Sequence, residues 1–163
     1  MKSTKLLILG FSCFYFTSCV YFNTFYNAEN SFKQANEIID NSSFNYENND
    51  IPTSAKKLLN ESIISSNIVI NEYSDSKYVD DAIYYMGRSY FTLAEYFKSE
   101  KYFSELINKY PDSKYFNESK LWLEYTRLKL EPKDVILENL KLIEKIINPK
   151  NDKKLFFLLH NIK

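Results

Sequence analysis

The side chains that could catalyse a reaction or bind a metal are scarce in this chain of 163 residues. It contains a single histidine, His160, and two cysteines, Cys13 and Cys19. A catalytic nucleophile needs a base beside it, and transition metals need several histidine or cysteine ligands. With only Gly10 and Gly87, a glycine-rich phosphate-binding loop cannot form. We therefore expect no enzyme activity, no metal, no cofactor and no small-molecule substrate.

The charge balance and the composition narrow the class of protein further. Lysine and arginine together number 21, and aspartate and glutamate also number 21, so the formal net charge is zero. Phosphate binding depends on a clear excess of basic residues, so we expect no nucleic-acid partner. Aromatic residues make up 17% of the chain, whereas there are only 2 glycines and 4 prolines, too few for the turns of many short strands. The composition therefore favours helices.

The first eighteen residues differ in character from the rest of the chain. Lys2 and Lys5 precede an apolar run over residues 6–16, and small hydroxyl residues follow it. This order is typical of a secretory signal, which is removed and takes no part in the fold. We expect the cut before Cys19, so that residues 1–18 form a signal peptide and residues 19–163 form one mature domain.

The tetrapeptide F-T-S-C that ends at Cys19 resembles the lipobox of bacterial lipoproteins, although Phe16 replaces the usual leucine. The resemblance implies that Cys19 carries a lipid and becomes the mature N-terminus. Cys13 fits the pattern less well, because Phe11 occupies a position that needs a small residue. One alternative is an uncleaved signal anchor over residues 6–22, near the minimum length that spans a bilayer. A cytosolic chain is a further alternative.

An internal repeat organises the elements that follow. The segment EYSDSKYVDDAIYYM, which starts at Glu72, aligns without gaps with KYPDSKYFNESKLWL, which starts at Lys109, 37 residues later. A period in the mid-thirties is typical of stacked helix-turn-helix units. In each copy we expect Asp or Ser to provide an oxygen to the first free amides of the next helix, because these residues are good helix N-caps. The sequence therefore predicts a helical array.

The segment from about residue 80 to 113 resembles one tetratricopeptide repeat, with Pro111 as its closing proline. Apolar and small residues at helical spacing predict that Gly87 allows a close approach between the two helices. The turn TLAE, residues 92–95, is expected to join them. The positions that match the repeat signature are Ile83, Met86, Gly87, Tyr90, Ser99, Phe103 and Leu106.

The flanking segments predict further helices. One runs from Phe25 to Ile39, with its partner over 52–72, and another covers 114–130. Two more are expected from Pro132 and from Asp152, and the polar segment between the first two helices should form an exposed loop. We therefore expect an all-α, tetratricopeptide-like helical-repeat solenoid of about seven helices. Adjacent aromatic residues are expected to divide, with one ring in the core and its neighbour pointing sideways or outward.

Tetratricopeptide superhelices usually bind along the concave face, which the first helix of each pair lines. Eight positions are expected to point outward on this face and to form a groove for a protein partner, with an ordinary solvated helix face as the alternative. They mix rings with both signs of charge. The residues are Asp81, Tyr84, Arg88, Phe91, Glu118, Leu121, Tyr125 and Lys129.

The lipobox at Cys19, the helix that starts almost directly after it and the YPDSKY turn together resemble the outer-membrane tetratricopeptide lipoproteins of the BamD/ComL type. The resemblance implies a lipid-anchored scaffold on the periplasmic side of the cell outer membrane. Its partners would be a subunit of the β-barrel assembly machine or outer-membrane protein precursors. The alternative is a structural tetratricopeptide lipoprotein of another envelope complex, for secretion, motility or Tol-type maintenance. Because the tether is short, we also expect Tyr21 and Phe22 to lie near lipid headgroups.

Overall fold

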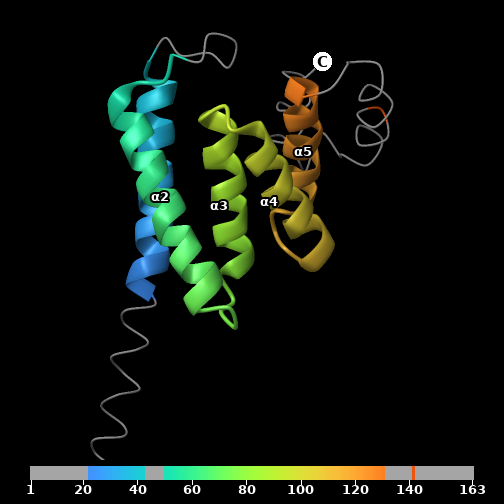
Figure 1. Cartoon of the computed structure of the whole chain (residues 1–163). Helices are drawn as coiled ribbons and strands as arrows, with labels where there is room; N and C mark the ends of the chain where they lie inside the picture. Colours follow the sequence, from blue (N-terminus) through green and yellow to red (C-terminus); the bar gives the residue numbers. More distant parts are fainter. Residues whose placement is uncertain (1–21, 43–49, 131–140, 142–163) are drawn as a thin grey trace, which may run out of the picture.

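The computed structural model describes residues 22–42, 50–130 and 141. All regular secondary structure in this part of the chain is α-helix. Five helices and no strand occur within 22–42 and 50–130 (Figure 1). They are the helix of residues 22–40, α2 (Thr53–Glu72), α3 (Val79–Thr92), α4 (Tyr96–Lys109) and α5 (Phe116–Leu130). The expected all-α class is confirmed for these residues. The expected count of about seven helices is not confirmed, because the helices expected from Pro132 and Asp152 lie outside the described residues. Residues 1–18 and Cys19 lie outside them as well.

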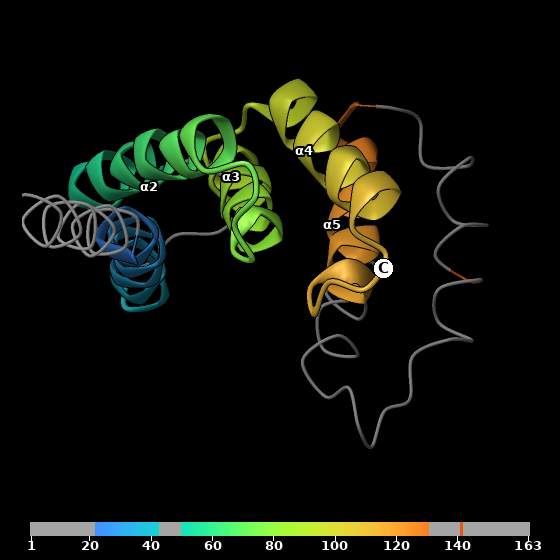
Figure 2. The ribbon, with the colours of Figure 1, turned by 90° about the horizontal axis from the view of Figure 1, so that it is seen from below.

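The helices form antiparallel pairs that stack side by side. The helix of residues 22–40 pairs with α2, α3 pairs with α4, and α5 continues the array against α4. Seen from below, α2 and α4 lie along the outer side of a shallow arc, and the helix of residues 22–40, α3 and α5 lie along its inner side (Figure 2). The helix of residues 22–40 and α3 are each the first of their pair, and α5 repeats their position, so the stacking is that of a helical-repeat array.

The first pair is held by a stripe of apolar and small residues. Phe25, Ala28, Phe32, Ala35 and Ile39 recur at helical spacing and are all buried, as the sequence predicts. The facing stripe of α2 contains small residues that allow the two backbones to approach closely. One of them, Ser62, donates a hydrogen bond from its Oγ to the carbonyl oxygen of Ala28 at 2.8 Å.

The second pair is closest at Gly87. A Cβ atom added there would lie 2.8 Å from the Cε1 atom of Phe103, so only glycine fits opposite this fully buried ring. Ser99 strengthens the approach by donating from its Oγ to the carbonyl of Gly87 at 2.9 Å. Ala94 in the connecting turn has a φ of 59° and reverses the chain between α3 and α4. The predicted close approach at Gly87 and the turn over 92–95 are therefore confirmed.

The two Asp-Ser-Lys-Tyr segments fold into the same turn. Ser76 accepts a hydrogen bond from the backbone N–H of Tyr78 at 2.9 Å, and Ser113 accepts the equivalent bond from Tyr115 at 3.2 Å. The serine therefore provides the expected oxygen, but to the amide of the tyrosine before each helix. At the start of α3, no side chain of the N-cap residue Tyr78 caps the helix. The predicted bond to the first free amides of α3 is therefore replaced by one to the amide just before the helix.

The adjacent aromatic pairs divide as expected in α4 and at the end of α3, where Phe91 is buried and the tyrosine before it is partly exposed, but not in the middle of α3. Phe103 is fully buried while its neighbour Tyr102 is partly exposed, and Phe97 is 79% exposed. Tyr84 and Tyr85 are instead both buried. The reason is the position of α3, which contacts α2, α4 and α5 and also receives the rings of the helix of residues 22–40. A helix surrounded in this way has almost no outward side.

Candidate functional site

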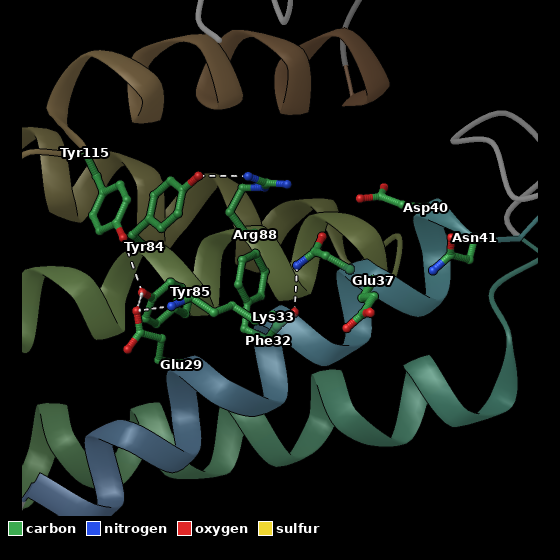
Figure 3. Close-up of a pocket in the computed structure, with 11 residues that line it drawn as sticks. Glu29, Phe32, Lys33, Glu37, Asp40, Asn41, Tyr84, Tyr85, Arg88 and Tyr115 are labelled. Carbon is green, nitrogen blue, oxygen red and sulfur yellow. Dashed lines mark hydrogen bonds and ion pairs between the residues drawn. The ribbon is translucent and has the colours of Figure 1, made fainter.

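A pocket of about 660 Å³ opens on the inner side of the arc, between the helix of residues 22–40 and α3 (Figure 3). Its walls come from these two helices and from Tyr115, which immediately precedes α5. The first helices of adjacent repeats thus form its two sides, as in a peptide-binding groove. The lining residues are Glu29, Phe32, Lys33, Asn36, Glu37, Asp40, Asn41, Tyr84, Tyr85, Arg88 and Tyr115.

Stacked tyrosine rings build the floor of the pocket. The ring of Tyr84 lies parallel to that of Tyr115, with centroids 3.9 Å apart and an interplanar angle of 2°. Tyr85 packs against Phe32 at 5.1 Å and meets the edge of the Tyr115 ring at 6.1 Å. These contacts join residues from three different helical units. The floor is therefore a rigid ring cluster that depends on the repeats being stacked in this register.

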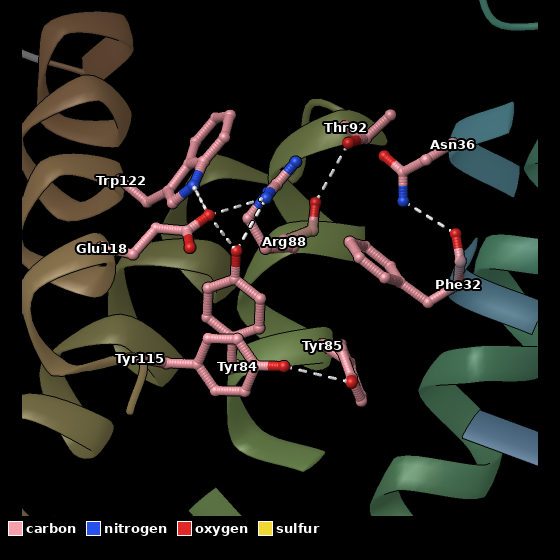
Figure 4. Close-up of polar contacts among 9 residues, drawn as sticks. All are labelled: Phe32, Asn36, Tyr84, Tyr85, Arg88, Thr92, Tyr115, Glu118 and Trp122. Atoms are coloured by element: carbon pink, nitrogen blue, oxygen red, sulfur yellow. Dashed lines mark hydrogen bonds and ion pairs between the residues drawn. The ribbon is translucent and has the colours of Figure 1, made fainter. Parts of the chain in front are cut away.

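Beside the floor, a buried network of polar groups joins α3 to α5 (Figure 4). Arg88 donates to the hydroxyl of Tyr84 at 2.8 Å and forms an ion pair with Glu118 at 3.4 Å. The same carboxylate oxygen of Glu118 accepts hydrogen bonds from the Tyr84 hydroxyl and, at 3.3 Å, from the indole N–H of Trp122. Arg88 also lies over the Trp122 ring, 3.9 Å from its centroid. The positive charge is thus compensated inside the protein.

Burial fixes the protonation state of the tyrosines in this region. Loss of solvent raises the pKa of Tyr84 well above its ordinary value, and the nearby carboxylate of Glu118 acts in the same direction. Burial and the hydrogen bond to Tyr115 likewise raise the pKa of Tyr85. Both hydroxyls therefore stay protonated at physiological pH and act as hydrogen-bond donors and acceptors, without serving as bases.

A second polar cluster lies at the lower end of the pocket. The Tyr85 hydroxyl donates to Glu29 at 3.2 Å, and Lys33 forms an ion pair with the same carboxylate oxygen at 2.8 Å. The hydrogen bond from Lys33 holds the pKa of Glu29 below its ordinary value. Asp81 pairs with Lys114 at 2.5 Å, yet burial raises its pKa above the ordinary value. For Lys114, burial opposes the charge, but the pair with Asp81 outweighs it and raises the pKa.

The eight groove positions predicted from the sequence are not all on an open surface. Asp81, Tyr84, Arg88, Phe91, Glu118 and Leu121 are buried, whereas Tyr125 and Lys129 are partly exposed. The expectation that they point outward is wrong for the six buried residues. The rings of adjacent first helices fill the space between them, as where Phe91 packs against Tyr125 at 4.8 Å. Of the eight, only Tyr84 and Arg88 line the pocket. Their role in binding a partner stays a prediction.

Sequence reasoning missed the polar residues that the helix of residues 22–40 contributes to the pocket. Glu29, Lys33, Glu37 and Asp40 follow one another at intervals of three or four residues, which is the spacing of one helix face, and Asn36 lies beside Glu37. This spacing could have identified them. The 37-residue repeat predicts groove positions only forward from the best repeat, because a backward shift of residues 81–91 by 37 falls on residues 44–54, beyond this helix.

Metal binding and membrane spanning leave no sign in the described residues. Nowhere in 22–42 and 50–130 do three or more histidine, cysteine, aspartate or glutamate side chains gather so that they could hold a metal ion. Among the same residues, no helix combines the length and the apolar character needed to cross a bilayer.

Comparison with known proteins identifies the central unit of the array. The family profile described as tetratricopeptide repeat matches residues 81–113, which contain nearly all of α3, the turn and α4. No curated protein and no solved structure matches the chain. Repeats of this type typically stack into non-enzymatic scaffolds that bind other proteins. Residues 81–113 are therefore a tetratricopeptide-type repeat, and the helices on both sides continue its stacking.

Proposed function

We propose that this protein is a non-enzymatic scaffold that binds a segment of another protein in the pocket between the helix of residues 22–40 and α3. One observation carries the proposal. The first helices of two adjacent repeats enclose a pocket of about 660 Å³ on the inner side of the array. Pockets of this size accommodate a few side chains of a ligand. A rigid floor of stacked rings supports binding because little order is lost when a ligand enters.

We further propose that Cys19 carries a lipid that holds the scaffold on the periplasmic side of the outer membrane. The lipobox-like sequence supports this, as do two exposed aromatic residues at the adjacent end of the helix of residues 22–40. Phe22 is 56% exposed and Tyr26 is 51% exposed, one helical turn apart. Aromatic side chains in such positions favour the membrane interface. Phe22 follows Cys19 by three residues, at most about 10 Å of extended chain.

The BamD/ComL resemblance suggests the task of this scaffold. We propose that it takes part in the assembly of β-barrel outer-membrane proteins, with an assembly subunit or a barrel precursor as its partner. Lowering its level in cells should then reduce the amount of folded β-barrel proteins in the outer membrane. If the partner belongs to a secretion, motility or Tol-type complex, that fraction stays constant and the assembly role is wrong.

Site-specific crosslinking in cells tests the binding proposal. A photoreactive amino acid at Asn36, which lines the pocket, should capture a partner that mass spectrometry identifies. The same amino acid at Asn67, an exposed position on the outer helix α2, is the matched control. Equal capture from both positions would contradict binding in the pocket. Radiolabelled palmitate should be incorporated into the protein but not into its Cys19→Ala variant. If neither protein is labelled, the proposed lipid anchor is wrong.

A further inference from the structure

The charges on the wall of the pocket do not cancel. Lys33 is paired with Glu29 at 2.8 Å, and Arg88 is paired with Glu118 at 3.4 Å. Glu37 and Asp40 line the same pocket and form no ion pair with any residue in the described part of the chain. Figure 3 shows both carboxylates on the upper part of the helix of residues 22–40, beside the opening. Two negative charges therefore remain at the rim.

The position of these two carboxylates is unfavourable for the helix itself. Glu37 and Asp40 lie in the last turn of the helix of residues 22–40, where the aligned backbone carbonyls give the helix end a partial negative charge. Cations are the residues that stabilise this end of a helix. A local arrangement that opposes stability is most often found where a protein binds or reacts. A cation from a ligand would relieve both the dipole and the two uncompensated charges.

The rest of the lining fits the uncharged part of a basic side chain. Below the rim, the floor is formed by aromatic rings, and Tyr115 is only partly buried. Lysine and arginine have long apolar stems, and their charged ends interact favourably with ring faces. The protein already uses this kind of contact around the pocket: for example, Arg88 lies 5.5 Å from the centre of the Phe32 ring, and Lys114 lies 4.9 Å from that of Tyr115.

From the charge and the lining together, we infer that the pocket takes a protein segment that carries lysine or arginine next to apolar residues, with the basic side chain held by Glu37 and Asp40. This inference rests on the proposed function, because it names the chemistry of the partner for the same pocket. It excludes acidic segments, which the two carboxylates would repel. Binding of the basic segment should weaken as salt rises, since the rim is open to solvent.

Two synthetic peptides and the full protein test this inference. One short fluorescent peptide alternates arginine and leucine, and the other replaces each arginine by glutamate. By fluorescence anisotropy, we expect the basic peptide to bind at least about tenfold more tightly, in keeping with two charge pairs at a partly exposed rim. Raising the salt from about 0.05 M to about 0.5 M should remove most of this difference. Equal affinities for the two peptides, or tighter binding of the acidic one, would overturn the inference.

A pair of double variants locates the effect. Glu37→Gln with Asp40→Asn should weaken binding of the basic peptide about fivefold to tenfold. Glu72→Gln with Asp75→Asn is the matched control, because it removes two exposed carboxylates around the C-terminal end of α2, away from the pocket lining, and should leave binding unchanged. Neither double variant should unfold the protein, since each relieves repulsion at a helix end.

The outcomes separate the inference from the proposed function. If Asn36 captures a partner in cells while the Glu37 and Asp40 variant binds the basic peptide as well as the control does, the pocket binds a protein but its charge does not select it. If Asn36 captures nothing and neither peptide binds, the pocket is not a binding site and both proposals fail. Binding that weakens equally in both double variants would show a general charge effect and would also overturn the inference.

Discussion

The carboxylate of Glu118 is the acceptor on which the buried contacts between α3 and α5 converge. Arg88, Tyr84 and Trp122 all direct a donor to its Oε1 atom. Glu118→Gln keeps the shape of the side chain and removes its charge, which leaves the arginine without a counter-ion. Both members of the ion pair have only 11% of their side chains exposed. Water therefore cannot replace the lost carboxylate at low cost.

The size of the loss follows from these contacts. Breaking a buried ion pair costs about 3–5 kcal/mol. Arg88 keeps its contact with the face of Trp122 at 3.9 Å, and a desolvated contact of this kind contributes about 2 kcal/mol. Because that contact is retained, we expect the free energy of unfolding to fall by about 3 kcal/mol, at the lower end of the range. With a urea dependence of about 1–3 kcal/mol per molar, the unfolding midpoint should fall by about 1–3 M.

Urea unfolding of the full protein measures this loss with two probes. Circular dichroism follows all helices, and fluorescence follows Trp122, the only tryptophan in the chain. Replacing both charges, by Arg88→Met with Glu118→Leu, should cost clearly less than the two single replacements added together, because the buried charges leave together. The remaining loss comes from the Tyr84 hydroxyl and the Trp122 indole N–H, which no longer have their shared acceptor. Glu105→Gln breaks the exposed pair with Lys109 and should cost less than about 0.5 kcal/mol.

Two results would refute the reasoning about Glu118. If Glu118→Gln costs no more than Glu105→Gln, the carboxylate is not the buried counter-ion of Arg88. If the double replacement loses as much stability as the two single replacements added together, the residues are not coupled, and the ion pair does not explain the burial of the charges.

Three further predictions concern other parts of the fold. Gly87→Ala should destabilise the protein by up to about 2 kcal/mol in urea unfolding, because overpacking outweighs the gain in helix propensity. In a Phe103→Leu background it should be neutral or stabilising, and destabilisation in both backgrounds would refute the steric cause. Burial raises the pKa of Asp81, so the carboxyl group binds its proton more tightly in the folded protein than in the unfolded chain. The contribution of Asp81 to stability therefore falls as the pH rises from the ordinary aspartate pKa of about 4 toward the raised value. Asp81→Asn should remove this decline when stability is measured against pH, and an unchanged profile would contradict the prediction. In vesicles that carry the lipid-anchored protein, a tryptophan at Phe22 should be quenched by brominated lipids more than one at Asp40, which lies about 27 Å further along the helix, and equal quenching would exclude the expected orientation.

The helices and their buried faces follow from the sequence because local spacing determines them. The stripe from Phe25 to Ile39 and the small residue at Gly87 are visible as helical periodicity, and the structure buries both as predicted. The repeated turn is predictable for the same reason, since Ser76 and Ser113 act on amides only two residues away. Contacts within one turn or one helix face need no knowledge of the distant chain.

The candidate site is less predictable because it depends on how adjacent repeats stack. Helical position alone predicts that Tyr84 and Phe91 point outward, but it does not show that rings of their own pair and of the next unit cover them. The stack of Tyr84 on Tyr115 joins residues 31 positions apart, and the hydrogen bond from Tyr85 to Glu29 joins residues 56 apart. The rotation between repeats sets such contacts, and a single repeat does not encode it.

This stacking gives the buried aromatic rings and the exposed carboxylates of the pocket different roles. Rings that the sequence predicts on the open groove are used to join the repeats, so a mutation of Tyr84 or Arg88 would disturb the fold and any binding together. Glu37 and Asp40 are exposed and have no ion pair within the described part of the chain, so replacing them should cost little stability. We therefore expect Glu37 and Asp40 at the rim to determine selectivity for a partner, and the shape that the buried rings maintain to determine affinity. Variants at the rim are consequently the ones that separate recognition from folding.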